Sequence, residues 1–153
     1  MSQSQESVAF ASGSLLGRAQ RRIIGLIVLL ACLAPLVAAA SIVPDASGYG
    51  THRQLGMPAC GFLLATGGPC PTCGMTTSFA HAVRGNLLRA AFVQPGGLLL
   101  CLLAACGVWI GLHTLVFDSR AVEVAFGALT TRTILAILGV LLLAYIYKLT
   151  TWN

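Results

Sequence analysis

Charged residues are scarce in this chain. Asp, Glu, Lys and Arg together make up 8% of its 153 residues, and only four of them are acidic. The nine basic residues are too sparse to form the continuous positive surface on which nucleic-acid binding depends. We therefore expect no nucleic acid among the partners of this protein.

The residue patterns of several enzyme and transporter classes are also missing. The sequence contains no Ser/His/Asp set, no paired carboxylates and no phosphate-binding loop, which argues against hydrolase and kinase chemistry. Transporters commonly carry acids within the membrane, but none of the acids here lies inside an apolar run. The four acids are Glu6, Asp45, Asp118 and Glu123.

Apolar residues dominate instead. The chain is 57% hydrophobic with a mean hydropathy of +0.87, which is typical of a membrane protein. Three apolar runs, 23–43, 95–117 and 133–149, are long enough to cross a hydrocarbon core of about 30 Å. We expect Tyr145, Tyr147 and Trp152 to form an aromatic belt, with Lys148 extending to the membrane surface.

The segments between these runs complete the predicted architecture. Residues 1–22 read as a disordered tail with a basic end, 44–72 as a cysteine-bearing loop, 73–93 as short interfacial helices and 118–132 as a connector. The fold class is therefore all-α, a polytopic protein with three transmembrane helices. An alternative for the first run is a cleaved secretory signal, since Ala38-Ala39-Ala40 precedes Ser41.

Basic residues indicate the orientation. Three arginines directly precede the first run, which favours a cytoplasmic N-terminus and an outward cysteine loop. With that topology five basic residues are inside and four outside. The inner set is Arg18, Arg21, Arg22, Arg120 and Arg132, and the outer set is Arg53, Arg84, Arg89 and Lys148.

The loop residues 67–79 hold the densest group of reactive and conformationally special residues. Glycines and prolines exclude a regular helix before Cys73, and Thr72 or Cys70 can cap the helix that follows. A thiolate at a helix N-terminus is stabilised by the free N–H groups, so Cys70 is a candidate low-pKa nucleophile or metal ligand.

Two kinds of chemistry fit these cysteines. In the first, Cys60, Cys70, Cys73 and His52 bind zinc or iron, because tetrahedral thiolate sites need four ligands. His81 is too far for this role, since eight helical residues separate it from Cys73 by about 12 Å. In the second, Cys70 and Cys73 form a dithiol that cycles with a disulfide, as in a membrane thiol-disulfide oxidoreductase.

A family resemblance covers residues 60 to about 100. Cys60, the run Cys70-Pro71-Thr72-Cys73-Gly74-Met75-Thr76, Phe79, Arg84-Gly85-Asn86 and Gln94-Pro95 resemble the domain-of-unknown-function 2752 family of small, mostly bacterial membrane proteins. Thr77 stands where that family commonly has Arg, and Gln94 where it commonly has Asn. The resemblance implies a membrane protein and brings no activity with it.

The sequence thus predicts a non-catalytic integral membrane component whose cysteine loop forms a structural or metal-binding site. Its expected surroundings are the lipid bilayer and a membrane protein partner. A redox enzyme using Cys70 and Cys73 is the alternative. The compartment bears on the state of the cysteines, because an oxidising space favours a structural disulfide and a reducing one favours bound metal.

Overall fold

The computed structural model describes residues 3–151 of the chain, with side chains described from residue 17 onward. The elements are α1 (Gln3–Ala40), the 3₁₀ helix η1 (Thr51–Leu55), α2 (Gly61–Thr66), α3 (Met75–Ala82), α4 (Leu87–Val93), α5 (Pro95–Phe117), α6 (Ala121–Ala128) and α7 (Thr131–Thr150). No strand occurs among the described residues, which confirms the predicted all-α fold. Residues 1–2 of the predicted tail and Trp152 lie outside the described residues.

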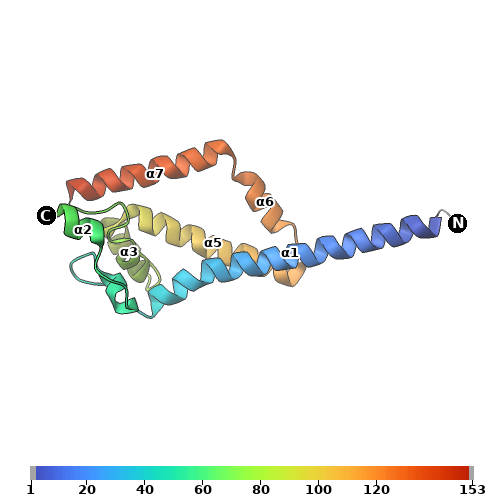
Figure 1. Ribbon diagram of the computed structural model, residues 1–153, viewed down its shortest axis with the longest axis horizontal. Helices are drawn as coiled ribbons and strands as arrows, with labels where there is room; N and C mark the ends of the chain where they lie inside the picture. Colours follow the sequence, from blue (N-terminus) through green and yellow to red (C-terminus); the bar gives the residue numbers. More distant parts are fainter. Residues whose placement is uncertain (1–2, 152–153) are drawn as a thin grey trace.

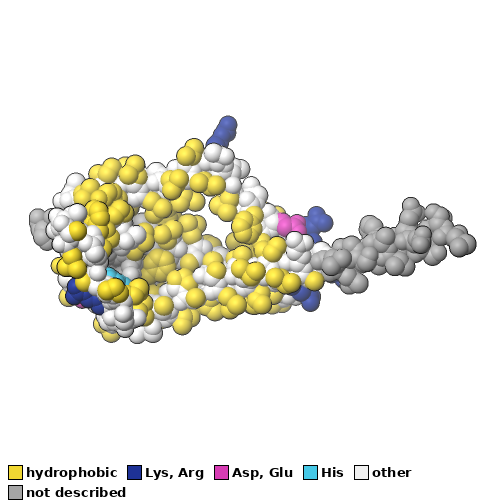
Figure 2. Space-filling view, in the orientation of Figure 1, with side chains coloured by type: hydrophobic (Ala, Val, Ile, Leu, Met, Phe, Trp, Pro, Cys, Tyr) yellow, Lys and Arg dark blue, Asp and Glu magenta, His cyan; other side chains and the backbone are white. Residues whose placement is uncertain are grey.

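Three of these helices are long and apolar enough to cross a membrane, as predicted. They are Gly17–Ala40 within α1, the whole of α5 and the whole of α7. Hydrophobic side chains cover the surface along them, and charged side chains gather near their ends (Figure 2). This exposed apolar surface matches a chain that contacts the lipid bilayer.

Several helix ends differ from the predicted ones, mainly because apolar runs do not mark the polar ends of helices. Helix α1 begins at Gln3, ahead of the predicted start at Ile23, and α7 begins at Thr131. The Thr130 hydroxyl accepts a hydrogen bond from the backbone N–H of Thr133, at 3.4 Å, and so caps α7. The short helices η1 and α2 occupy part of the predicted loop 44–72.

Helices α1 and α5 lie side by side and form the main contact of the molecule (Figure 1). A Cβ added to Gly111 would lie 2.8 Å from both the Gly25 carbonyl oxygen and the Leu29 amide nitrogen. A Cβ added to Gly107 would collide with the Cys32 sulfur. These glycines let the two backbones approach closely, as small residues do between membrane helices.

The N-terminal end of α5 is equally crowded by two other helices. A Cβ on Gly97 would lie 2.8 Å from the Ser78 Cβ of α3, and one on Gly96 would lie 3.2 Å from the Ala144 Cβ of α7. The Ser78 hydroxyl lies 2.9 Å from the Ala90 carbonyl and 3.0 Å from that of Gln94. Helix α5 therefore anchors the interfacial helices and the C-terminal part of α7.

Helix α7 stands apart from the α1–α5 pair over most of its length, and α6 joins the two at the opposite end (Figure 1). Within its described residues only Ala144 and Lys148 are buried. Both belong to its C-terminal half, beside the cysteine loop. The rest of the helix presents exposed apolar side chains, in agreement with contact with the lipid bilayer.

Polar contacts fasten the two ends of the helices differently. At the N-terminal end of the first span, Arg18 and Arg21 approach Asp118 at 3.7 and 3.8 Å, and Arg21 also lies 3.8 Å from Glu123. At the other end of the span, Arg84 forms hydrogen bonds to backbone carbonyls and, within the described residues, no ion pairs; it donates to the Ala39 carbonyl at 3.2 Å. Further acceptors of Arg84 are the carbonyls of Ala40, Ile42 and Ala80.

The glycine contacts predict that Gly111→Ala destabilises the protein. The added methyl group meets backbone atoms of α1 that cannot rotate away, so we expect a loss of about 1–3 kcal/mol, read as a lower Tm in detergent. Gly139→Ala in α7 is the matched control, because a Cβ there meets nothing within 4 Å. Equal Tm changes for the two variants would contradict the close α1–α5 contact.

Candidate cysteine site

The turn that carries Cys70 and Cys73 is shaped by glycines on either side. Gly67 ends α2 with φ of 68°, and Gly74 precedes α3 with φ of 87°. Residues that carry a side chain rarely adopt such positive φ angles. A Cβ on Gly74 would also lie 2.9 Å from the Gly48 carbonyl oxygen. Gly74 therefore holds the N-cap position of α3, and the predicted capping by Thr72 or Cys70 is wrong.

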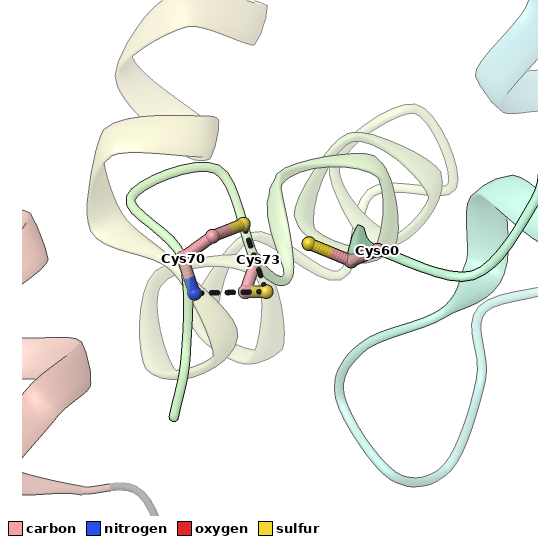
Figure 3. Close-up of side chains that lie close together, drawn as sticks. All are labelled: Cys60, Cys70 and Cys73. Carbon is pink, nitrogen blue, oxygen red and sulfur yellow. Dashed lines mark hydrogen bonds between the residues drawn. The ribbon is translucent and has the colours of Figure 1, made fainter. Parts of the chain in front are cut away.

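Three cysteines converge at this turn. Cys60 lies at the start of α2, and the short helix brings the chain back so that its sulfur faces those of Cys70 and Cys73 (Figure 3). The three Sγ atoms all lie within 4.8 Å of one another. Cys70 and Cys73 are buried, with 8% and 7% of their surface exposed, and Cys60 is half-buried. The structure thus brings together all three predicted cysteine ligands.

Cys70 and Cys73 are directly hydrogen-bonded to each other. Their sulfurs lie 3.0 Å apart as free thiols, and the Cys70 backbone N–H donates to the Cys73 sulfur at 3.2 Å. The Cys70 sulfur also lies 3.2 Å from the Thr72 hydroxyl. The pair is therefore held in one geometry by the turn itself.

The two thiols differ in acidity. Burial acts to raise the pKa of Cys70, but hydrogen bonds from Cys73, Thr72 and Cys60 together lower that pKa below its ordinary value. Burial and the hydrogen bond to Cys70 raise the pKa of Cys73 to about 12. Cys70 is consequently the first of the pair to become a thiolate.

A buried polar frame behind the turn was not foreseen from the sequence. The hydroxyls of Thr51 and Thr77 lie 2.7 Å apart, and the Thr51 hydroxyl also accepts from the Asp45 N–H at 3.0 Å. Gln94 is fully buried and its side-chain amide donates to the Pro71 carbonyl at 3.2 Å. Thr77 and Gln94 are the two positions singled out above as departures from the family pattern; Thr77 joins α3 to η1, and Gln94 bonds to the cysteine turn.

Lys148 is the second unforeseen residue. Its Nζ donates to the Val93 carbonyl at 3.2 Å, and a Cβ on Gly74 would lie 3.4 Å from it. Only 8% of Lys148 is exposed, and its ammonium group lies close enough to Cys73 to interact electrostatically. The predicted extension of Lys148 to the membrane surface is therefore wrong. No local signal could have revealed this, because the contact joins residues far apart in the chain.

A cavity of about 380 Å³ opens beside the sulfurs. His52 and Arg53 of η1 line it together with the three cysteines. His52 Nε2 lies 3.2 Å from the Pro58 carbonyl oxygen, and the histidine is not part of the close sulfur cluster. His81 lines a separate cavity, in agreement with its exclusion as a ligand.

Comparisons with known proteins agree with the motif. Residues 60–109 match the family model described as "Protein of unknown function (DUF2752)". The match starts at the first clustered cysteine and ends within α5, so it leaves α1, η1 and α7 outside. No curated protein and no solved structure matches the chain.

The acidity difference predicts selective alkylation. In reduced, metal-free protein, iodoacetamide reacts with thiolates, so at neutral pH we expect Cys70 to be modified at least about tenfold faster than Cys73. The rate at Cys70 should level off below the pH of an ordinary thiol, while that at Cys73 keeps rising toward pH about 12.

Timed alkylation followed by peptide mass spectrometry measures both rates. The variant Cys70→Ala removes the hydrogen bond and the charge that raise the pKa of Cys73, so Cys73 should react faster in that variant. Identical pH profiles for the two thiols in the unsubstituted protein would refute the assigned order.

Proposed function

On the premise that residues 60–109 form a DUF2752 family domain, we propose that this membrane protein binds one thiophilic metal ion through Cys60, Cys70 and Cys73. The observation that carries the proposal is the convergence of three sulfurs within 4.8 Å from two different segments. Tetrahedral zinc with Zn–S bonds near 2.3 Å separates its sulfurs by about 3.8 Å, which fits this cluster after small side-chain rotations.

The donor set favours soft or borderline metals. Three thiolates suit zinc or iron and do not suit magnesium or calcium, which prefer oxygen ligands. Three thiolates and a divalent ion leave one net negative charge. The buried ammonium group of Lys148 beside Cys73 offsets that charge, which supports an anionic centre at this place.

His52 is the proposed fourth ligand. It lines the cavity onto which the sulfurs open, and its Nε2 pairs with the Pro58 carbonyl. Metal-bound histidines commonly donate their second ring N–H to a backbone carbonyl, which fixes the ring. The proposal therefore uses Nδ1 for the metal and keeps the Pro58 hydrogen bond.

The proposed role is structural rather than catalytic. A bound ion ties the start of α2 to the turn before α3 and so fixes the interfacial helices against α5. The described spans carry few polar side chains, which supports a component that packs in the membrane against a protein partner. We place it in a bacterial inner membrane with a cytoplasmic N-terminus and the cysteine site on the outer side, where a bound ion would have to protect the three thiols from forming a disulfide.

Metal content tests this proposal. Protein purified anaerobically in detergent should contain about one zinc or iron per chain by elemental mass spectrometry, with thiols that become reactive after chelation. We expect Cys60→Ser, Cys70→Ser and Cys73→Ser each to lose most of the metal. His52→Ala should weaken binding, and Cys106→Ser, which alters a cysteine outside the cluster, should retain it.

A second candidate function rests on the 3.0 Å separation of the Cys70 and Cys73 sulfurs and their unequal acidity. In this thiol-disulfide exchange, the Cys70 thiolate attacks a substrate disulfide and releases one substrate thiolate. Cys73, once deprotonated, then attacks the Cys70 sulfur and releases the second thiolate. The exchange leaves Cys70 and Cys73 joined as a disulfide, so a partner dithiol must reduce the pair before each further cycle.

Trapping distinguishes the two functions. If the pair is catalytic, Cys73→Ser accumulates a mixed disulfide through Cys70 in cells, visible as a reductant-sensitive band on gels, and Cys70→Ser does not. Purified protein would then lack metal, and two of its thiols would react only after reduction. About one metal per chain with all three thiols reduced would exclude the redox function.

A further inference from the structure

A second cavity of about 380 Å³ lies on the other side of α3 and shares no lining residue with the cysteine cavity. Pro44 and Asp45 of the connector after α1 form one wall, and His81 of α3 forms another. Arg89, Phe92 and Val93 of α4 complete it. Neither the metal proposal nor the redox alternative uses these residues.

The cavity wall holds a histidine and an arginine that is not paired with any acid the structure describes. His81 Nδ1 is buried and has no hydrogen-bond partner among the described residues. Arg89 is exposed, and within residues 17–151 it forms no ion pair and no side-chain hydrogen bond. Because Nδ1 is closed off by protein, a ligand in the cavity meets the other edge of the His81 ring, which carries Nε2.

Positive charge dominates the surroundings of His81. Arg84 binds only neutral carbonyl oxygens, so its charge is not cancelled locally. Burial, and then the charges of Arg89 and Arg84, lower the pKa of His81. Asp45 is the one acid in the cavity wall, and its carboxylate is engaged by the Ser47 N–H and hydroxyl at 2.9 and 2.7 Å. Two guanidinium groups thus outweigh one carboxylate.

The excess positive charge favours an anionic ligand, and the position of the cavity at the membrane surface indicates which kind of anion it would bind. It lies between the end of α1 at Ala40 and the start of α5 at Pro95, where the first two spans leave the hydrocarbon region. Helix α4 exposes Leu88 and Phe92 by 78% and 71%, as an interfacial helix does. A phosphate in the cavity would therefore have acyl chains next to an apolar surface.

We propose that this cavity binds the phosphate group of an anionic phospholipid. The Arg89 guanidinium and the ring N–H of His81 that faces the cavity donate to the phosphate oxygens, and the exposed apolar side chains of α4 contact the lipid tails. This site is independent of the metal, since the two cavities are separate. Free inorganic phosphate shares the same chemistry and is a competing outcome of the test.

Native mass spectrometry of the full-length protein in detergent tests the proposal, with phosphatidylglycerol and phosphatidylcholine added in turn. We expect tighter binding of phosphatidylglycerol and about a fivefold loss of that affinity in Arg89→Gln. His81→Leu should also weaken binding, and His81→Asn, which restores an N–H donor, should recover part of it. Arg132→Gln removes an exposed arginine at the opposite end of the spans and should change nothing.

Three results would overturn the lipid assignment. Equal affinities for the two lipids would remove the requirement for an anionic headgroup. Equal effects of Arg89→Gln and Arg132→Gln would mean that any basic residue at the membrane surface suffices. Displacement of phosphatidylglycerol by inorganic phosphate, but not by chloride at matched ionic strength, would assign the cavity to free phosphate. Because Arg89 is exposed, its substitution leaves the folded core intact.

Discussion

The close contact between α1 and α5 is the constraint on which the rest of the structure depends. Gly25, Gly107 and Gly111 allow the two backbones to meet, and lipid tails offer no hydrophobic driving force that could replace such packing. The contact places the end of α1 beside the start of α5. The short helices around the cysteines pack where these two helix ends meet. Arg84 joins them by donating to a carbonyl at the end of α1 and to one in α3.

The cysteine turn is held by neutral polar groups more than by apolar burial. Four fully buried polar residues have hydrogen-bond partners here: Thr51 and Thr77 pair with each other, Ser78 bonds to α4, and Gln94 bonds to the turn. In a region between water and lipid, such bonds are strengthened by the low local dielectric, and each unpaired group would be costly. The sulfurs therefore sit in a pre-arranged frame, which suits either a bound ion or a dithiol.

The fold class and the three spans were predictable because bilayer thickness fixes the length of an apolar run. The cysteine turn was also recognisable, since Gly67, Gly74 and the two prolines exclude a helix there. The convergence of Cys60 with the later pair depends on α2, whose short sequence carries no clear helical period. The sequence predicted least well the site residues whose role depends on contacts with residues far away in the chain.

Lys148 illustrates that limit. Lysines near the ends of membrane helices commonly reach water, and only the tertiary packing of α7 turns this one toward Val93 and the cysteine turn. His52 is an intermediate case. The sequence placed it in a flexible connector as a ligand, and the structure puts it in the wall of the sulfur cavity, hydrogen-bonded through one ring nitrogen.

The burial of Lys148 also shows that residues outside the family domain help to support it. The recognisable family domain ends within α5, yet three of its residues bond to parts of the chain outside it. Val93 accepts from Lys148 of α7, Thr77 pairs with Thr51, and Arg84 donates to carbonyls at the end of α1. A segment cut at the domain boundaries would lack all three supports. The domain is thus a unit of sequence similarity, and we expect it to need the helices around it in order to fold.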